Sequence, residues 1–286
     1  MDTNKLKALV VLADTLNFSR AADQLHMSPS TLSRVITQIE QELRVALFVR
    51  NNRSVQLTAA GKRCCEYAKS TLAEFATLQQ ELMQANDVLK GDISIYCSVT
   101  ASYSFLHEIL AQFRDDHPHI RFLLHTGDHA QALERISQGL EDVAIAARPD
   151  VLRQGIVFKA ITQSPLVFIE PAHIAKRRPD EVNWQELALI LPEQGVGRAR
   201  IDRWFAHLGI RPLIQAQVGG HEAIVSMVSL GFGVGLVPKV VVDNSPLAQQ
   251  VRLFCIQPEI KPYEVGVCVL EKRLKNPLVR AFWSKL

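Results

Sequence analysis

Apolar positions at the start of the chain fall at the spacing of short helices. One predicted helix has apolar residues at steps of three and four along a single face: Leu6, Leu9, Val10, Ala13 and Leu16. A second helix, which Ser19 can cap, has small residues that suit a steep helix crossing: Ala21, Ala22 and Leu25. After a break at residues 26–28, Ser28 can cap a third helix with Pro29 at its first position. This order predicts a helix-turn-helix.

The third predicted helix has two chemically different faces. Its apolar face consists of Leu32, Ile39 and either Val35 or Ile36. The opposite face is polar: Ser30, Thr31, Ser33, Arg34, Thr37 and Gln38. Short hydroxyls near a helix start allow close approach to a DNA duplex, and Arg34 and Gln38 are long enough to reach base edges or phosphates. Any three-helix bundle also has a solvated polar face, so the pattern by itself leaves both interpretations open.

Two short strands, residues 47–50 and 54–58, are predicted next and form a small wing. Arg50 and Arg53 stand at its tip, where they can contact the DNA backbone or minor groove. The residues expected to contact DNA come from the second helix, the third helix and the wing: Ser19, Arg20, Ser28, Pro29, Ser30, Thr31, Ser33, Arg34, Gln38, Arg50 and Arg53.

A longer helix is predicted from Thr58, which can cap it, to about Leu89, with Gly91 ending it. Residues at alternating steps of three and four form a heptad seam along it: Cys65, Ala68, Leu72, Phe75, Gln79, Leu82, Asn86 and Leu89. A helix of about 30 residues must bury such a stripe, either on its own domain or against a second copy. We expect dimerisation through these residues: Ala68, Leu72, Phe75, Gln79 and Leu82. A dimer would present two recognition helices to an imperfect inverted repeat in double-stranded operator DNA.

Strands and helices alternate from Asp92 onward. The expected strands are residues 93–97, 121–125, 142–147, 166–169, 189–191 and 214–218, with helices around 105–113 and 201–205. This alternation predicts parallel sheets covered by helices and divided into two lobes.

Three loops in this region lead into helices: residues 98–102, 193–198 and 219–222. Helix N-termini beyond the carboxyl ends of strands supply free N–H groups that favour anions. Capping explains each loop alone, whereas three together favour a small anionic effector. Two of the residues have an alternative interpretation: His221 can serve packing only, and Arg148 can be a solvated surface residue. Its expected residues are Ser98, Thr100, Ala101, Ser102, Arg148, Gly195, Val196, Gly220, His221 and Glu222.

Composition and charge restrict the class of protein. The 286 residues are 48% hydrophobic and 21% charged, as in an ordinary globular chain of about two domains. Residues 1–63 hold nine Lys/Arg against five Asp/Glu, while the remainder has a net charge of −1. A basic head before a neutral body suits a polyanion partner. The five cysteines lack metal-ligand spacing, so we expect reduced thiols, no metal and no cofactor other than the effector.

Neither a secretory signal nor a run of about 20 apolar residues is visible, which predicts a cytoplasmic protein with no membrane partner. The GxSxG, HExxH and Walker patterns are also missing, so no catalytic residue is assigned and no enzyme is expected. A cytoplasmic small-molecule-binding protein or an enzyme is the distant alternative. A solute-binding transport component would match the body but explain neither the basic head nor the lack of a signal.

The N-terminal residues resemble those of LysR-type transcriptional regulators. The resemblance is carried by Leu6, Phe18-Ser19-Arg20-Ala21-Ala22, Leu25, Ser28-Pro29-Ser30-Thr31-Leu32-Ser33, Ile39-Glu40, Leu47-Phe48-Val49-Arg50 and Leu57-Thr58-Ala59-Ala60-Gly61. It implies an α/β protein with an α-helix-rich head. The winged helix-turn-helix would span 1–58 and the dimerisation linker helix 59–90. A periplasmic-binding-protein-like effector domain would span 91–286, with lobe I at 91–161 and 265–286 and lobe II at 162–264. The family also implies tetramers and RNA polymerase as a further partner.

One residue departs from the family pattern. The family usually has glycine after Leu43, where this chain has Arg44. If the turn needs a left-handed backbone, arginine costs about 1 kcal/mol.

Further strings resemble one group within the family, the activators of the acetohydroxy acid isomeroreductase gene in isoleucine–valine synthesis. They are residues 48–53, 97–101, 218–223, 266–268 and 272–274. The resemblance implies acetolactate or acetohydroxybutyrate as co-inducer, with Ser98, Thr100 or Ser102 binding the hydroxyl and keto oxygens. A LysR-type regulator of another pathway, sensing a different small carboxylate, is the alternative.

Overall fold

The computed structural model describes residues 2–51, 54–83, 89–175, 182–254, 256 and 258–286. The chain forms two compact units: residues 1–87 with 138–140, and residues 88–137 with 141–286. Each unit has its own hydrophobic core. None of the helices within the described ranges is both long and apolar enough to cross a membrane.

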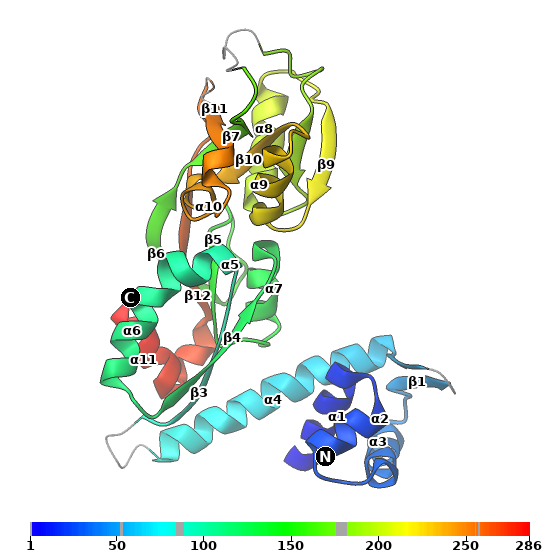
Figure 1. The fold of residues 1–286 in the computed structure, drawn as a ribbon. Helices are drawn as coiled ribbons and strands as arrows, with labels where there is room; N and C mark the ends of the chain where they lie inside the picture. The colour runs from blue at the N-terminus through cyan, green and yellow to red at the C-terminus, as the bar shows by residue number, and fades with distance from the viewer. Residues whose placement is uncertain (1, 52–53, 84–88, 176–181, 255, 257) are drawn as a thin grey trace. The chain divides into compact units, whose positions relative to one another are not determined.

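The N-terminal unit is a winged helix-turn-helix followed by a long helix (Figure 1). Its elements are α1 (Thr3–Thr15), α2 (Phe18–Gln24), α3 (Pro29–Leu43), β1 (Phe48–Asn51), β2 (Ser54–Leu57) and α4 (Ala59–Met83). The strands pair antiparallel from Phe48 opposite Leu57 to Asn51 opposite Ser54. A fully buried set from all three short helices and the wing forms the core: Leu9, Leu12, Ala21, Ala22, Leu32, Ile36, Ile39 and Leu47.

Local capping sets the ends of the short helices. Ser28 caps α3 by accepting a hydrogen bond from the backbone N–H of Thr31 at 3.1 Å, with Pro29 at the first position, as predicted. The prediction that Ser19 caps the second helix is wrong. Asn17 caps α2 by accepting from the N–H of Arg20 at 3.0 Å, and Ser19 lies inside the first turn. Asparagine and serine cap equally well, so the sequence did not separate these two positions.

Arg44 ends α3 in the left-handed conformation, with φ 54° and ψ 33°. The departure from glycine at this position therefore places a side chain where the backbone favours a residue without one. The N–H of Arg44 still bonds to the carbonyl of Gln41 at 3.3 Å.

Helix α4 begins as predicted, because Thr58 Oγ1 accepts a hydrogen bond from the N–H of Gly61 at 2.9 Å. The described part of α4 ends at Met83, and residues 84–88 lie outside the described residues, so the predicted end at about Leu89 stays a prediction. Leu89 itself is not helical, and Gly91 is the first residue of a strand. The seam residue Asn86 lies outside the described residues. The seam itself changes along the helix: Ala68 is buried in the unit's own core and Leu72 packs against it, whereas Phe75, Gln79 and Leu82 are exposed.

Lobe I of the larger unit is a five-stranded sheet in the order β4-β3-β5-β12-β6. The strands are β3 (Gly91–Cys97), β4 (Ile120–Thr126), β5 (Val143–Ala147), β6 (Ile156–Ser164) and β12 (Tyr263–Leu270). The helical segments are α5 (Val99–Ala101), η1 (Ser102–Leu106), α6 (His107–Asp116), η2 (His129–Gln131), α7 (Ala132–Ser137), η5 (Glu271–Lys275) and α11 (Pro277–Lys285). β3 runs parallel to β4 and β5, whereas β12 runs antiparallel to β5 and β6.

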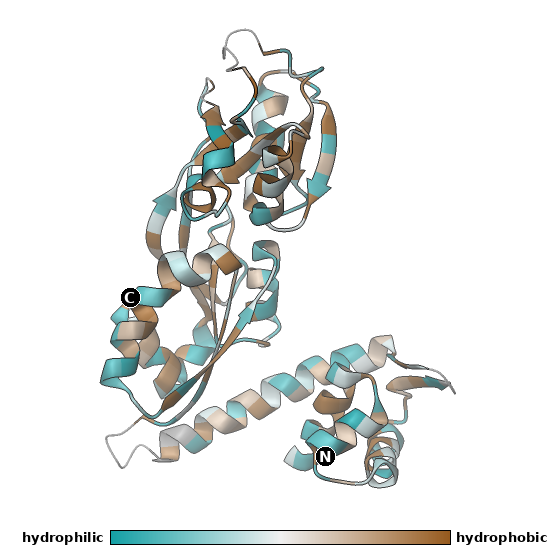
Figure 2. Cartoon of the chain, viewed as in Figure 1, coloured by the Kyte–Doolittle hydropathy of each residue, from teal (hydrophilic) through white to brown (hydrophobic). Residues whose placement is uncertain are grey.

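Lobe II is a second five-stranded sheet in the order β11-β7-β10-β8-β9. Its elements are β7 (Leu166–Pro171), β8 (Leu189–Pro192), α8 (Val196–His207), β9 (Ile214–Val218), α9 (His221–Ser229), β10 (Val234–Pro238), α10 (Lys239–Asp243), η4 (Ala248–Gln250) and β11 (Val251–Phe254). β8 is parallel to β9 and β10, but β7 is antiparallel to β10 and β11. Both sheets are thus mixed, which corrects the prediction of parallel sheets. Figure 2 shows apolar residues concentrated on the strands of both sheets.

The chain passes between the lobes twice, from β6 to β7 and from β11 back to β12. The two connecting strands pair with each other from Tyr263 opposite Ser164 to Leu270 opposite Ile156. Their register shifts once, between Val265 and Gly266. The predicted lobe boundaries, between 161 and 162 and between 264 and 265, fall within these strands.

Candidate DNA-binding surface and inter-lobe cleft

Helix α3 has a buried face and an exposed polar face, as its sequence predicts. Leu32, Ile36 and Ile39 are fully buried, so Ile36 rather than Val35 points into the core. The residues expected to contact DNA from the two helices and the turn are exposed, except for Ser33, which is partly buried: Ser19, Arg20, Ser28, Pro29, Ser30, Thr31, Arg34 and Gln38. Thr31, Arg34 and Gln38 lie one and two helical turns apart on this face.

The hydroxyls at the start of α3 form a small network. Ser28 Oγ lies 2.8 Å from Thr31 Oγ1 and 2.9 Å from Ser30 Oγ. Ser28 therefore caps the helix and also orients two hydroxyls on the exposed face. Such fixed donors and acceptors suit phosphate contacts.

The arginines of this unit fall into two kinds. Within the described part of the chain, Arg20 and Arg34 form no ion pair. Arg50 instead pairs with Glu40 at 2.7 Å and lies over the ring of Phe18 at 5.2 Å. Arg50 thus holds the wing on the helices, a role that the sequence did not indicate. Arg53 lies outside the described residues, so its predicted contact stays a prediction.

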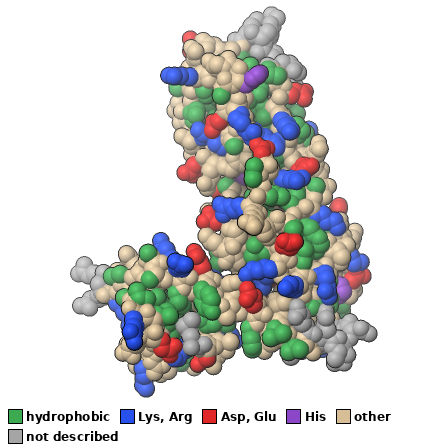
Figure 3. All heavy atoms as spheres, turned by 180° about the vertical axis from the view of Figure 1, so that it is seen from behind, with side chains coloured by type: hydrophobic (Ala, Val, Ile, Leu, Met, Phe, Trp, Pro, Cys, Tyr) green, Lys and Arg blue, Asp and Glu red, His purple; other side chains and the backbone are tan. Residues whose placement is uncertain are grey.

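Charges on the larger unit are mixed. In the face drawn in Figure 3, its basic side chains stand beside acidic ones, which agrees with the nearly neutral charge of the body.

The two lobes of the larger unit are joined across their cleft by polar contacts. Thr100, which follows β3 in lobe I, donates to Oε1 of Glu222 in α9 from its hydroxyl at 2.5 Å and from its backbone N–H at 3.1 Å. Asp150 of lobe I pairs with Arg203 of α8 at 2.6 Å. Gln194 of lobe II donates a hydrogen bond from its side-chain amide to Oδ2 of Asp128 in lobe I at 3.3 Å. The lobes are therefore closed on each other.

Two histidines, one from each lobe, stack in the middle of this cleft. The rings of His129 and His221 have centroids 4.0 Å apart and an interplanar angle of 22°. Burial lowers the pKa of His129, and burial together with the neighbouring His129 ring lowers the pKa of His221 well below its ordinary value. Both imidazoles are therefore neutral near pH 7. His129 Nδ1 lies 3.2 Å from Oδ1 of Asp128, and among the described residues its Nε2 has no hydrogen-bond partner.

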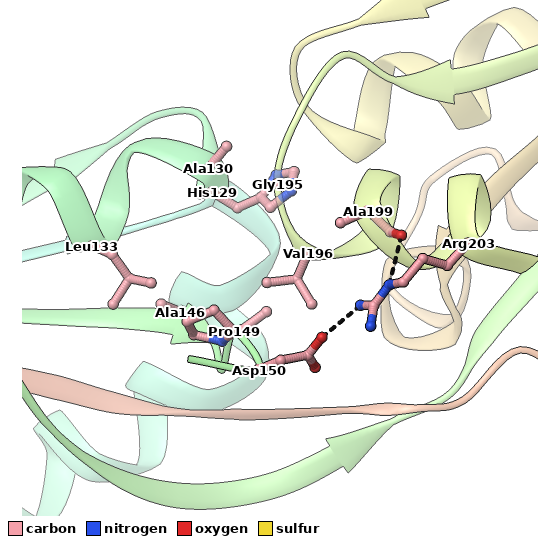
Figure 4. A pocket seen from close by; sticks show the side chains of 11 residues that line it. His129, Ala130, Leu133, Ala146, Pro149, Asp150, Gly195, Val196, Ala199 and Arg203 are labelled. Carbon is pink, nitrogen blue, oxygen red and sulfur yellow. Dashed lines mark hydrogen bonds and ion pairs between the residues drawn. The ribbon is translucent and has the colours of Figure 1, made fainter. Parts of the chain in front are cut away.

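Two cavities adjoin the histidine stack. The larger, of about 240 Å³, is drawn in Figure 4 and lies between α7 and β5 of lobe I and the start of α8. It is lined by His129, Ala130, Leu133, Ala146, Ala147, Pro149, Asp150, Gly195, Val196, Ala199 and Arg203. The smaller, of about 40 Å³, is lined on its polar side by Ser98, Thr100, His129, His221 and Tyr263. His129 separates the two spaces, because it lines both.

The structure brings together most of the residues predicted for the effector. Ser98, Thr100, Ala101 and His221 line the smaller cavity, and Gly195 and Val196 line the larger. Gly220 precedes α9 with φ 82°. Four predicted residues line neither cavity: Ser102, Arg148, Gly220 and Glu222. The Ser102 hydroxyl donates to the carbonyl of Val99 at 2.7 Å, and Arg148 pairs with Glu264 at 2.9 Å. Arg148 instead lines a further hollow together with Asp150 and Arg203.

Three residues that line the cavity of Figure 4 were not indicated by the sequence pattern: His129, Asp150 and Arg203. His129 had a usable signal, because it follows β4, the parallel neighbour of β3, and neighbouring parallel strands end at the same edge of a sheet. The pairing of Asp150 with Arg203 had no local signal, since the two residues come from different lobes.

Comparisons with known proteins agree with this architecture. Residues 3–62 match the family described as bacterial regulatory helix-turn-helix protein, lysR family, and residues 86–286 match the LysR substrate binding domain. The chain belongs to the LysR family and is a LysR-type DNA-binding transcriptional regulator. The predicted family and fold class are confirmed.

Its similarity to one kind of LysR regulator covers the full length. The chain is 40% identical to the HTH-type transcriptional activator IlvY of Haemophilus influenzae, over 100% of both chains. It is 42% identical to the HTH-type transcriptional regulator IlvY of Escherichia coli K12, over 100% of this chain and 99% of that one.

Solved structures of LysR regulators share the fold. The LysR family regulator CbnR has a TM-score of 0.70 at 20% identity, covering 100% of this chain and 98% of that one. Full-length CbnR complexed with its target DNA has a TM-score of 0.68 at 21% identity, with the same coverage.

Proposed function

We propose that this protein activates transcription of an isoleucine–valine biosynthetic gene when acetolactate or acetohydroxybutyrate binds between the lobes of its larger unit. The observation that carries the proposal is the full-length identity of 40–43% to IlvY activators. The cleft supports it, because polar groups from both lobes meet around two neutral imidazoles and two cavities.

The chemistry of the cleft suits a small hydroxy-keto acid. A neutral imidazole has both a donor and an acceptor nitrogen, which a hydroxyl and a keto oxygen can use together. Among the described residues, Arg203 is the guanidinium that lines the cavity of Figure 4, and Asp150 already neutralises it. The carboxylate would therefore be held by hydroxyl and backbone donors such as those of Thr100, and by the N-terminus of α9.

DNA recognition in this proposal uses α3 and the wing, and dimerisation uses the exposed end of α4. Phe75, Leu78 and Leu82 are large apolar residues that remain exposed along that end. A second copy would cover them and give the operator its imperfect inverted repeat. Effector binding between the lobes would then change the geometry of a dimer or tetramer on DNA and the access of RNA polymerase. We propose a cytoplasmic regulator that needs no catalytic residue and no cofactor besides the effector.

Calorimetry tests the ligand. The full-length protein is titrated with acetolactate and acetohydroxybutyrate, and separately with valine and pyruvate. Binding heat for the first two alone supports the proposal. Heat for neither would leave a LysR regulator of another pathway and overturn the isoleucine–valine assignment.

Footprinting on the promoter of the acetohydroxy acid isomeroreductase gene tests the target. Protection of an imperfect inverted repeat, with in vitro transcription raised by the effector, is the expected result. Protection with repression would contradict activation.

A further inference from the structure

Glu222 places a carboxylate where the proposed effector would place its own. It lies in the first turn of α9 in lobe II, and its Oε1 accepts both donors of Thr100 in lobe I. Thr100 is buried, and its side chain lines the smaller cavity. The contact is therefore part of the wall of the cleft rather than a surface ion pair.

The two donors of Thr100 both bind the same oxygen, Oε1 of Glu222. A backbone N–H and a hydroxyl that converge on one oxygen form a two-donor cradle for one oxygen of a carboxylate. Because Glu222 already fills this cradle, a ligand carboxylate needs either different donors or the removal of Glu222.

The electrostatics of the cleft disfavour two carboxylates side by side. Within the described part of the chain, Glu222 has no ion pair, and both Asp128 and Glu222 act electrostatically on the His129 ring. The nearest rings, His129 and His221, are neutral, and no cation is paired with this carboxylate among the described residues. A second negative charge beside Glu222 would be repelled with little compensation.

We propose that Glu222 is an internal stand-in for the effector carboxylate: it latches lobe II to Thr100 in the effector-free protein, and the effector binds by displacing it. The identity of the displacing ligand rests on the proposed function, whereas the latch does not. The larger unit then has two closed forms. In one, the donors of Thr100 bind Glu222, and in the other they bind the ligand. If the latch is open in about 10% of molecules, its loss should tighten effector binding about tenfold.

The first test measures ligand affinity with matched variants of the full-length protein. Glu222→Gln keeps the side-chain volume but removes the charge, and a neutral amide is a weaker acceptor than a carboxylate. Glu186→Gln, at an exposed position of lobe II, is the control. Calorimetry with acetolactate should show about tenfold tighter binding for Glu222→Gln and no change for the control. Weaker binding by Glu222→Gln would show that Glu222 contacts the ligand and would overturn the proposal.

The second test needs no ligand. Hydrogen exchange of the Thr100 amide in the effector-free protein reports the latch directly, because that N–H is bonded to Glu222. Exchange should quicken in Glu222→Gln and in Glu222→Asp, whose shorter side chain withdraws the carboxylate, and stay unchanged in Glu186→Gln. Unaltered exchange in both Glu222 variants would overturn the latch. If the wild type binds no acetolactate while exchange responds as expected, the latch stands and only the proposed effector fails.

Discussion

Arg50 Nη2 lies 2.7 Å from Oε2 of Glu40, whose other carboxylate oxygen accepts hydrogen bonds from the backbone N–H groups of Leu47, at 2.8 Å, and Phe48, at 3.1 Å. One carboxylate on α3 therefore holds the entry to the wing and one of its arginines. The position of the wing relative to the recognition helix depends on this residue.

Glu40→Ala should destabilise the N-terminal unit by about 1–3 kcal/mol, because it leaves two partly buried N–H groups and the Arg50 guanidinium without their acceptor. Urea unfolding monitored by circular dichroism measures the change. Glu66→Ala, at an exposed position of α4, is the control and should lie within about 0.5 kcal/mol of the wild type. Equal stability of the two variants would contradict the anchoring role of Glu40.

Arg44→Gly should stabilise the same unit by about 1 kcal/mol, since glycine adopts the left-handed backbone at this position without steric cost. Arg44→Ala provides the matched control, because it removes the charge and keeps the strained Cβ. Chemical denaturation of the three proteins should give a gain for glycine alone. A similar gain for alanine would attribute the effect to charge.

Arg34→Ala should weaken operator binding by about 1–3 kcal/mol, because this guanidinium stands on the exposed face of α3 and has no ion pair with any residue that the structure describes. Fluorescence anisotropy with operator DNA at two salt concentrations measures the loss. Arg114→Ala, an exposed substitution in lobe I, should leave affinity unchanged. Full affinity in the Arg34 variant would remove this residue from the DNA contact.

Leu82→Lys should weaken self-association, since Leu82 exposes 74% of its surface at the end of α4 and is placed to be covered by a second copy. Sedimentation velocity over a range of concentrations follows the shift toward monomer. Leu230→Lys alters a similarly exposed leucine on lobe II and should not change the distribution. The same distribution in both variants would exclude this part of α4 from the dimer.

The stability of the larger unit should fall as pH drops below about 6.5. Burial lowers the pKa of both His129 and His221 from their ordinary value of 6.5. Above that pH both histidines are neutral in the folded and unfolded states, and below it the unfolded chain takes up protons that the fold excludes. Urea unfolding at pH 7.5 and 5.5 should show a smaller loss for His221→Phe, which keeps a stacking ring without a proton site. An identical loss in the variant would assign the effect to other groups.

Short sequence patterns, such as helix caps and alternating apolar residues, predicted the helices and strands whose limits depend on neighbouring residues. Ser28 and Pro29 define the start of α3 by themselves, and alternating apolar residues locate β3. The choice between Asn17 and Ser19 as cap was not decidable from type, because both are good caps. The antiparallel direction of β12 had no local signal, since it depends on where the chain returns after lobe II.

Some residues of the candidate site were also predictable from local sequence, and others were not. Loops that leave strands and enter helices correctly indicated Thr100 and His221, which line the smaller cavity. Arg148 instead forms an ion pair with Glu264 of the same lobe. The stacking of His129 on His221 depends on closure of two lobes that are far apart in sequence. The spacing of residues within one lobe therefore could not predict that these two histidines stack.

The paired strands β6 and β12 limit how the two lobes can move relative to each other when an effector binds in the cleft. Because the two strands are hydrogen-bonded to each other along their lengths, the lobes cannot slide past one another without breaking this ladder, whose register shifts once, beside Gly266. A Cβ at Gly266 would lie 2.3 Å from the carbonyl oxygen of Lys159, so this point of the ladder has no room for a side chain. Both passages of the chain between the lobes run through these two paired strands, so a change in the separation of the lobes has to bend the two strands together.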